Sequence, residues 1–344
     1  MLKAQLHSRT PRNLVILLLL LTSLLAPPAA SAANLQFVVH QSDQFALAGH
    51  TYSAAKMTAD GVLYLYSRDP LVVLKKPANE PPAVISLSGL PNLAPYQLLN
   101  DFAVDAQGAL YVPALWKDAS RVLHSGVFVL DPDGRYQRTV EFAVPVETRH
   151  IAVDETGNLF VLGIDGRYYR GKTTDDSLLH KFNSTGAHVR AFSPAVMPLA
   201  SGEVFQRAKR DIDKGLLVFG PDGLLYSVMA ESGALRIFDS DGTLVKETRL
   251  IQPEARDQWI WHFVPLPGNR YLVHWVHSDI SGSVMTNRPY LALHNGSGEV
   301  IAGPARQPWS RSYPIAADRD ANCYFLHDLG EGTQELVTTT VSVR

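Results

Sequence analysis

Two segments of this chain place polar side chains where an apolar strand is about to begin. Asp101 precedes the apolar residues 102–104, and the pair Arg149-His150 precedes residues 151–153. A carboxylate, a guanidinium and an imidazole can bind a polar ligand, exchange a proton with it or contribute to a metal site. The alternative is that they are solvated polar residues at a strand start. We take Asp101, Arg149 and His150 as candidate ligand contacts.

A second group of candidates is rich in aromatic and imidazole rings. Strand alternation predicts that Trp259, Trp261 and Phe263 share one face, where they could stack on a sugar or an apolar ligand. Packing between sheets is the alternative, and Trp261 is our best candidate for a ligand contact. Nearby histidines could meet on neighbouring strands and hold zinc, or they could be structural; they are His262, His274 and His277.

One long connection carries a basic and aromatic sequence around Arg167 and Arg170. Binding residues are often found on long loops of a rigid scaffold, so an anionic or carbohydrate ligand is one hypothesis for this loop. A solvated loop is the other. The lone cysteine, Cys323, lies in an apolar segment and is expected to be a buried small hydrophobe, which also excludes an internal disulfide.

The elements that must position these residues follow from a repeated phrase. Apolar residues precede a turn with Asp and Gly, and then comes an aromatic residue inside a second apolar segment. The aromatic positions of six copies lie between 45 and 66 residues apart: Tyr64, Tyr111, Phe160, Tyr226, Tyr271 and Tyr324. A strand-forming repeat of this length is typical of propeller blades.

Most copies are followed by a second hairpin with its own turn signal, such as Asp131-Pro132-Asp133-Gly134. Two hairpins make four strands, which is one blade. The sequence therefore predicts an all-β fold, a six-bladed β-propeller of four-stranded antiparallel blades within one domain, 34–344. The last repeat lacks a strand, which residues 35–39 could supply beside residues 334–343, so that both termini close the ring without an exposed edge.

The phrase resembles the NHL-type six-bladed propellers. Residues 102–111 and 151–160 match best, whereas residue 321 is Ala where the pattern has Gly. Propellers bind at the mouth of their central channel. Counting seven residues back from each turn glycine or its equivalent predicts the positions that line it: Ala54, Asp101, His150, Leu216, Trp261 and Pro314.

Two functions remain open on this resemblance. One is a binding module for a protein partner, a glycan or a small molecule at the channel mouth. The other is a metal-dependent hydrolase, lactonase or lyase, because related propellers hold calcium through Glu, Asn and Asp or zinc through three histidines. Here Asn100-Asp101 and His150 offer only part of such a set. Calcium and zinc are possible cofactors that the pattern does not favour.

The first 33 residues have the order of a secretory signal peptide. A basic leader precedes the apolar residues 14–25, and small residues suited to cleavage follow. The apolar run is too short to span a bilayer. Beyond it the chain has no basic block, so nucleic-acid binding is not expected. The sequence predicts a secreted or periplasmic monomer without a membrane span after cleavage.

Overall fold

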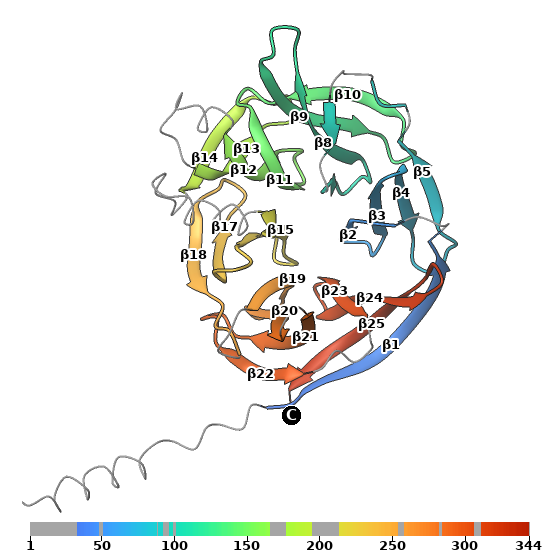
Figure 1. Ribbon diagram of the computed structural model, residues 1–344, viewed down its shortest axis with the longest axis vertical. Coiled ribbons are helices and arrows are strands. Elements are labelled where there is room, and N and C mark those ends of the chain that lie inside the picture. The colour runs from blue at the N-terminus through green and yellow to red at the C-terminus, as the bar shows by residue number, and fades with distance from the viewer. Residues whose placement is uncertain are drawn as a thin grey trace, which may run out of the picture.

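Six antiparallel sheets follow one another in a ring around a central axis, as predicted (Figure 1). The computed structural model describes residues 33–47, 51–87, 89–91, 96–98, 101–165, 177–194, 213–253, 258–281, 284–305 and 311–343. The proposed signal peptide therefore lies outside the described residues, apart from Ala33. No helix in the described part of the chain is long and apolar enough to cross a bilayer.

Each blade is a run of neighbouring strands, and in blades 1 to 5 the innermost strand comes first along the chain. Blade 1 consists of β2 (Ala54–Met57), β3 (Leu63–Arg68), β4 (Leu71–Lys76) and β5 (Ala83–Ser86). Blade 3 consists of β11 (Val146–Val153), β12 (Leu159–Asp165), β13 (Ser177–Phe182) and β14 (His188–Pro194). Blade 4 consists of β15 (Leu216–Phe219), β16 (Leu225–Val228), β17 (Ala234–Phe238) and β18 (Leu244–Arg249). Blade 5 consists of β19 (Gln258–Leu266), β20 (Arg270–Ser281), β21 (Val284–His294) and β22 (Val300–Ala305).

Blade 2 departs from the four-strand pattern in one respect. Its innermost strand is split, and both parts pair with the same neighbour. Its strands are β6 (Tyr96–Leu98), β7 (Ala103–Val104), β8 (Leu110–Lys117), β9 (Leu123–Leu130) and β10 (Tyr136–Glu141). Asp101 lies in the interval between the two parts, where it is free of the strand ladder.

The two ends of the chain close the ring in blade 6, as predicted. Blade 6 consists of β23 (Ser312–Ala317), β24 (Asn322–Gly330), β25 (Thr333–Val343) and, from the other end of the chain, β1 (Leu35–Ala46). β1 pairs antiparallel with β25, with Leu35 opposite Val343. The strand extends well beyond the predicted residues 35–39. This pairing covers the outer edge of β25, a site that would otherwise invite intermolecular pairing.

The repeated phrase encodes the turn between the first two strands of a blade. In blade 3 the carboxylate Oδ1 of Asp154 accepts hydrogen bonds from the amides of Thr156 and Asn158, each at 2.9 Å. Gly157 has φ +80°, the left-handed conformation that glycine adopts without strain. In blade 6 Ala321 takes the same role with φ 63°, so the departure from the sequence pattern leaves the turn intact.

The hydrophobic core lies between neighbouring blades. One cluster joins Phe160 of blade 3 to Leu217 and Phe219 of blade 4, and the rings of Phe160 and Phe219 meet edge to face at 5.6 Å. Each blade therefore needs its neighbours to bury its faces. Cys323 is fully buried in another such cluster, as expected, and burial raises the pKa of its thiol to about 12.

Candidate functional site

The central channel is a cavity of about 2050 Å³ lined by residues of all six blades. All six positions obtained by counting back from the turn glycines line this cavity: Ala54, Asp101, His150, Leu216, Trp261 and Pro314. The repeated phrase therefore predicts both the fold and the position on each innermost strand whose residue lines the channel. Their role toward a ligand stays a prediction.

The two ends of the channel differ in chemistry because the innermost strands all run the same way. One end, which we call the mouth, is where these strands begin. The other end carries the hairpin turns and is acidic, with Asp105, Asp154 and Asp318 among its lining residues. These carboxylates are engaged in their own turns, as for Asp318, which accepts from the amide of Asn322 at 2.9 Å. The mouth is therefore the end with side chains available for other roles.

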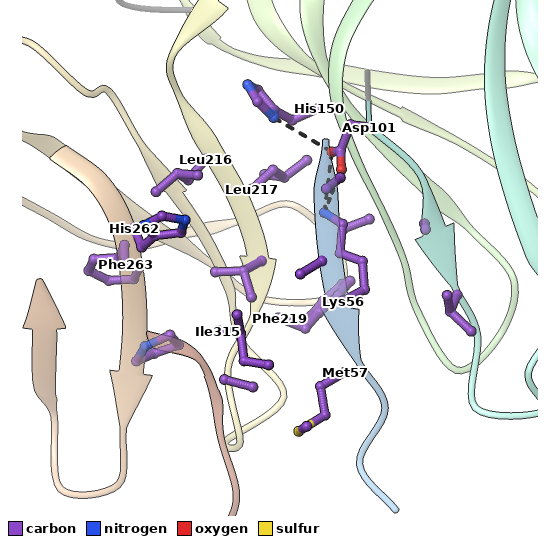
Figure 2. Close-up of a pocket in the computed structure, with 18 of the residues that line it drawn as sticks. Lys56, Met57, Asp101, His150, Leu216, Leu217, Phe219, His262, Phe263 and Ile315 are labelled. Carbon is purple, nitrogen blue, oxygen red and sulfur yellow. Dashed lines mark hydrogen bonds and ion pairs between the residues drawn. The ribbon is translucent and has the colours of Figure 1, made fainter. Parts of the chain in front are cut away.

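Three blades contribute to a polar cluster at the mouth (Figure 2). The ammonium Nζ of Lys56 lies 2.9 Å from Oδ1 of Asp101. Nδ1 of His150 lies 3.5 Å from Oδ2 of the same carboxylate, which also accepts the amide of Ile151 at 3.0 Å. Asp101 thus joins blade 1 to blade 3 from its place in blade 2.

The electrostatics of this cluster keep Asp101 ionised. Burial alone would raise its pKa, but the charge of Lys56 and the hydrogen bond from His150 outweigh burial and lower the pKa to about 2. An ionised carboxylate beside Nδ1 favours the tautomer with its proton on that nitrogen, which makes Nε2 an acceptor in the neutral ring. Nε2 is covered from solvent and has no hydrogen-bond partner among the described residues.

Arg149 is placed at the mouth by a β-bulge. The register of β11 against β12 shifts between Thr148 and His150, so Arg149 is the extra residue. Its guanidinium is held by two carboxylates, Oε1 of Glu147 at 2.6 Å and Oδ1 of Asp213 at 2.7 Å. The predicted ligand contact therefore lines the cavity as one member of an ion-pair network.

A second bulge presents Trp261. The register of β19 against β20 shifts between Ile260 and His262, and the indole is 54% exposed. One side of it stacks on His274, with ring centroids 5.6 Å apart and planes at 23°. His262 continues the stack toward Tyr313, at 4.4 Å between ring centroids. The exposed indole thus rests on a rigid base of rings.

The two histidines of this stack are uncharged. Nδ1 of His262 lies 2.9 Å from Nδ1 of His274, a distance at which one ring donates to the other. Burial lowers the pKa of His274 to about 3. Burial, and secondarily the neighbouring His274, also lower the pKa of His262 well below its ordinary value.

The bulge makes the predicted aromatic face wrong. Trp259 pairs with Val276 and Phe263 with Val273, on opposite sides of the shifted register. Phe263 packs into the core against Tyr226, at 5.9 Å between ring centroids. Trp259 instead carries the ammonium of Lys214 over its ring at 4.6 Å. Trp275 is fully buried and donates to His294, so it is no part of an open platform.

The sequence suggested a metal site from three histidines, and the structure brings two of them together. His277 lies further along β20, opposite Gln258 and Arg288. Among the described residues no group of three His, Cys, Asp or Glu side chains could hold a metal ion. Asn100, Arg167 and Arg170 lie outside the described residues, so their predicted roles are untested.

Two residues that line the mouth, Lys56 and Tyr313, were not predicted from the sequence. Lys56 carried a signal, since it is a lone cation in the otherwise apolar segment Ala54–Met57. Tyr313 carried none, because its stacking on His262 depends on blades 5 and 6 being neighbours.

Comparison with known proteins supports the fold. No protein-family model matches the chain, and no curated protein matches its sequence. Among solved structures, a member of the DUF4221 family from Bacteroides vulgatus matches with a TM-score of 0.57 at 11% identity, covering 91% of this chain and 100% of that one. A streptogramin B lyase matches with a TM-score of 0.47 at 9% identity, covering 90% of this chain and 98% of that one. The PQQ-bound aldose sugar dehydrogenase of Streptomyces coelicolor matches with a TM-score of 0.44 at 12% identity, covering 92% and 100%. At these identities the likeness concerns the fold alone, and the chain is a six-bladed β-propeller.

Proposed function

We propose that this protein is a binding module that takes a small ligand, or a single group of a larger one, at the mouth of its central channel. The observation that carries the proposal is the pairing of a half-exposed Trp261 with the Lys56–Asp101–His150 cluster in one cavity. Ligand sites typically combine an apolar surface with a few fixed polar groups in a concave pocket.

The recessed position of these groups favours a small ligand over a folded protein partner. Asp101 is only 5% exposed, and it lines the channel rather than the rim of a blade. A flat protein surface would not reach it. Trp261 lies on blade 5, which is three blades away from blade 2 in a ring of six and therefore faces it across the channel (Figure 1). A ligand that spans the channel would contact both.

The test is a ligand screen followed by substitution of the indole. Binding to the purified protein is measured by calorimetry, with Trp261→Ala as the variant and Tyr136→Ala, a partly exposed aromatic on the outer strand β10, as its control. A ligand whose affinity falls by about tenfold or more in the first variant only would support the proposal. Binding that is indifferent to Trp261 would contradict it.

A second candidate is an enzyme of the hydrolase or lyase class in the same channel. The observation that favours it is the arrangement at His150, whose Nδ1 faces an ionised carboxylate while Nε2 meets no partner within the described ranges. Such a histidine can take a proton from a substrate. His150→Gln should then abolish turnover while ligand binding persists. Elemental analysis of the protein, purified without chelators, tests the metal-dependent form of this candidate.

We further propose that the propeller is of the NHL type and that it is exported to the periplasm or the extracellular space. The phrases at residues 102–111 and 151–160 support the first point, and the signal-peptide pattern of residues 1–33 supports the second. Sequencing the N-terminus of the protein from the envelope or medium tests export. A chain retained in the cytoplasm with its first residues intact would contradict it.

A further inference from the structure

We propose that the mouth binds an uncharged sugar ring, with the apolar face of the ring on Trp261 and its hydroxyl groups on Lys56 and His150. This inference rests on the proposed function and specifies the ligand class. It follows from three properties of the mouth: the pairing of its charges, the nature of its aromatic surface, and the hydrogen-bonding capacity that remains.

Four cationic side chains that line the mouth have carboxylate partners. Lys56 is paired with Asp101, and Arg149 with Glu147 and Asp213, within 2.9 Å. Two others are more loosely paired: Lys214 with Glu231 at 3.7 Å, and Arg311 with Asp328 at 3.8 Å. An anionic ligand would have to compete with these carboxylates for the same donors. Paired charges still donate and accept hydrogen bonds, so the mouth suits hydroxyl groups better than a carboxylate or phosphate.

The aromatic surface is apolar and held in place from behind. Trp261 rests on the uncharged rings of His274 and His262, at 5.6 and 5.7 Å between ring centroids. Because the indole is half exposed, one of its surfaces is open to the cavity. The negative face of an indole attracts the positively polarised C–H groups on the apolar face of a pyranose, and the rigid base removes the entropy cost of ordering the ring.

In the Lys56–Asp101–His150 cluster, one donor and one acceptor keep hydrogen-bonding capacity. The ammonium of Lys56 has three protons, and its contacts to the two oxygens of Asp101, at 2.9 and 3.2 Å, leave one proton available. With the proton of the neutral ring on Nδ1, Nε2 of His150 is an acceptor that has no partner in the described part of the chain, and the side chain is 18% exposed. Because Nε2 itself is covered, a ligand reaches it only when the ring rotates. A hydroxyl both donates and accepts, so two adjacent hydroxyls of a sugar meet this pair of groups.

The experiment compares ligands that share a ring but differ in charge. The probes are the methyl glycosides of glucose, galactose and mannose, with glucuronate as the charged counterpart and benzoate as an anionic ring without hydroxyls. Titration is followed by calorimetry on the full chain. Trp261→Ala and Lys56→Met are the variants, and Tyr136→Ala and Lys246→Met, both on outer strands, are the controls. Circular dichroism and thermal unfolding verify that each variant is folded.

We expect at least one neutral glycoside to bind, with its affinity reduced about tenfold or more by either mouth substitution and unchanged by the controls. If glucuronate or benzoate binds in a Trp261-dependent manner and the neutral glycosides do not, the sugar inference is overturned while the proposed function stands. If no probe binds, the sugar inference is likewise overturned, and the ligand screen then decides the proposed function. If glycosides bind equally well to Trp261→Ala, both proposals fail.

Discussion

The ion pair between Lys76 and Asp43 should hold the propeller ring closed. Lys76 lies in β4 of blade 1 and its side chain is 1% exposed, whereas Asp43 lies in β1, the strand that the N-terminal end of the chain adds to blade 6. The ammonium also donates to the carbonyl of Pro77 at 2.9 Å and lies over the ring of Phe45 at 5.9 Å. This contact joins the beginning of the ring to its end.

Replacing Asp43 with alanine leaves a buried ammonium without its counter-charge. Breaking a buried ion pair from one side costs about 3–5 kcal/mol. The side chain of Asp43 is 24% exposed, so water replaces part of the lost interaction. We therefore expect a loss of about 2–3 kcal/mol in the free energy of unfolding, or roughly 5 °C in melting temperature. Lys76→Met removes the charge but keeps the apolar stem on Phe45, and should cost about 1 kcal/mol or less.

The assay is urea unfolding followed by tryptophan fluorescence, on the two single variants and the double variant. The double variant should be about as stable as Lys76→Met alone, because its buried charge is gone. The reasoning is refuted if Asp43→Ala unfolds at the same urea concentration as the wild type. It is also refuted if Lys76→Met is as damaging as Asp43→Ala, since the loss would then come from packing.

Two further predictions concern the aromatic base of the mouth and the turns. Because the buried His262 and His274 have lowered pKa values while unfolded histidine titrates near 6.5, the unfolded state takes up protons first as the pH falls. Stability is therefore full above about pH 6.5 and should decline by about 2 kcal/mol per histidine near pH 5. Replacing both with Phe should reduce the dependence of melting temperature on pH, while the buried His294, whose pKa is lowered to about 4, keeps its own contribution. An unaltered slope would count against this account. Gly186→Ala should destabilise the protein far more than Gly223→Ala. A Cβ atom at residue 186 would lie 2.0 Å from the carbonyl oxygen of Glu141, whereas a Cβ atom at residue 223 would have no atom within 4 Å. Both residues have positive φ, so the second variant should cost only about 1–2 kcal/mol, and equal melting temperatures would refute the steric argument.

The architecture was predictable because the information for each turn is local. Asp154 bonds to amides two and four residues further on, and Gly157 provides the left-handed residue, so the whole motif lies within a few positions. Repetition then gives the blade count, and the incomplete last repeat indicates closure by the N-terminal strand. The length of β1 was underestimated because its polar middle, from His40 to Gln44, hides the strand pattern.

The mouth was only partly predictable because its contacts cross blades. Asp101 is far in sequence from both of its side-chain partners. No local spacing therefore predicts that Lys56 and His150 both contact its carboxylate. Alternation also failed where a bulge intervened: one extra residue at Trp261 moved Phe263 to the opposite face from Trp259. Nothing in the local sequence marks that insertion.

The scaffold turns and the mouth lie at opposite ends of the innermost strands, which explains why the sequence predicts the fold but not the ligand. The repeated phrase lies at the turn end of each innermost strand, where Asp and Gly are fixed by backbone geometry. The candidate binding groups lie at the other end, and three innermost strands carry a bulge there, at Arg149, Trp261 and Ile315. A bulge re-aims a side chain without disturbing the turn several residues away. Substitutions at the mouth can therefore change the ligand while the turns, and with them the propeller, are preserved.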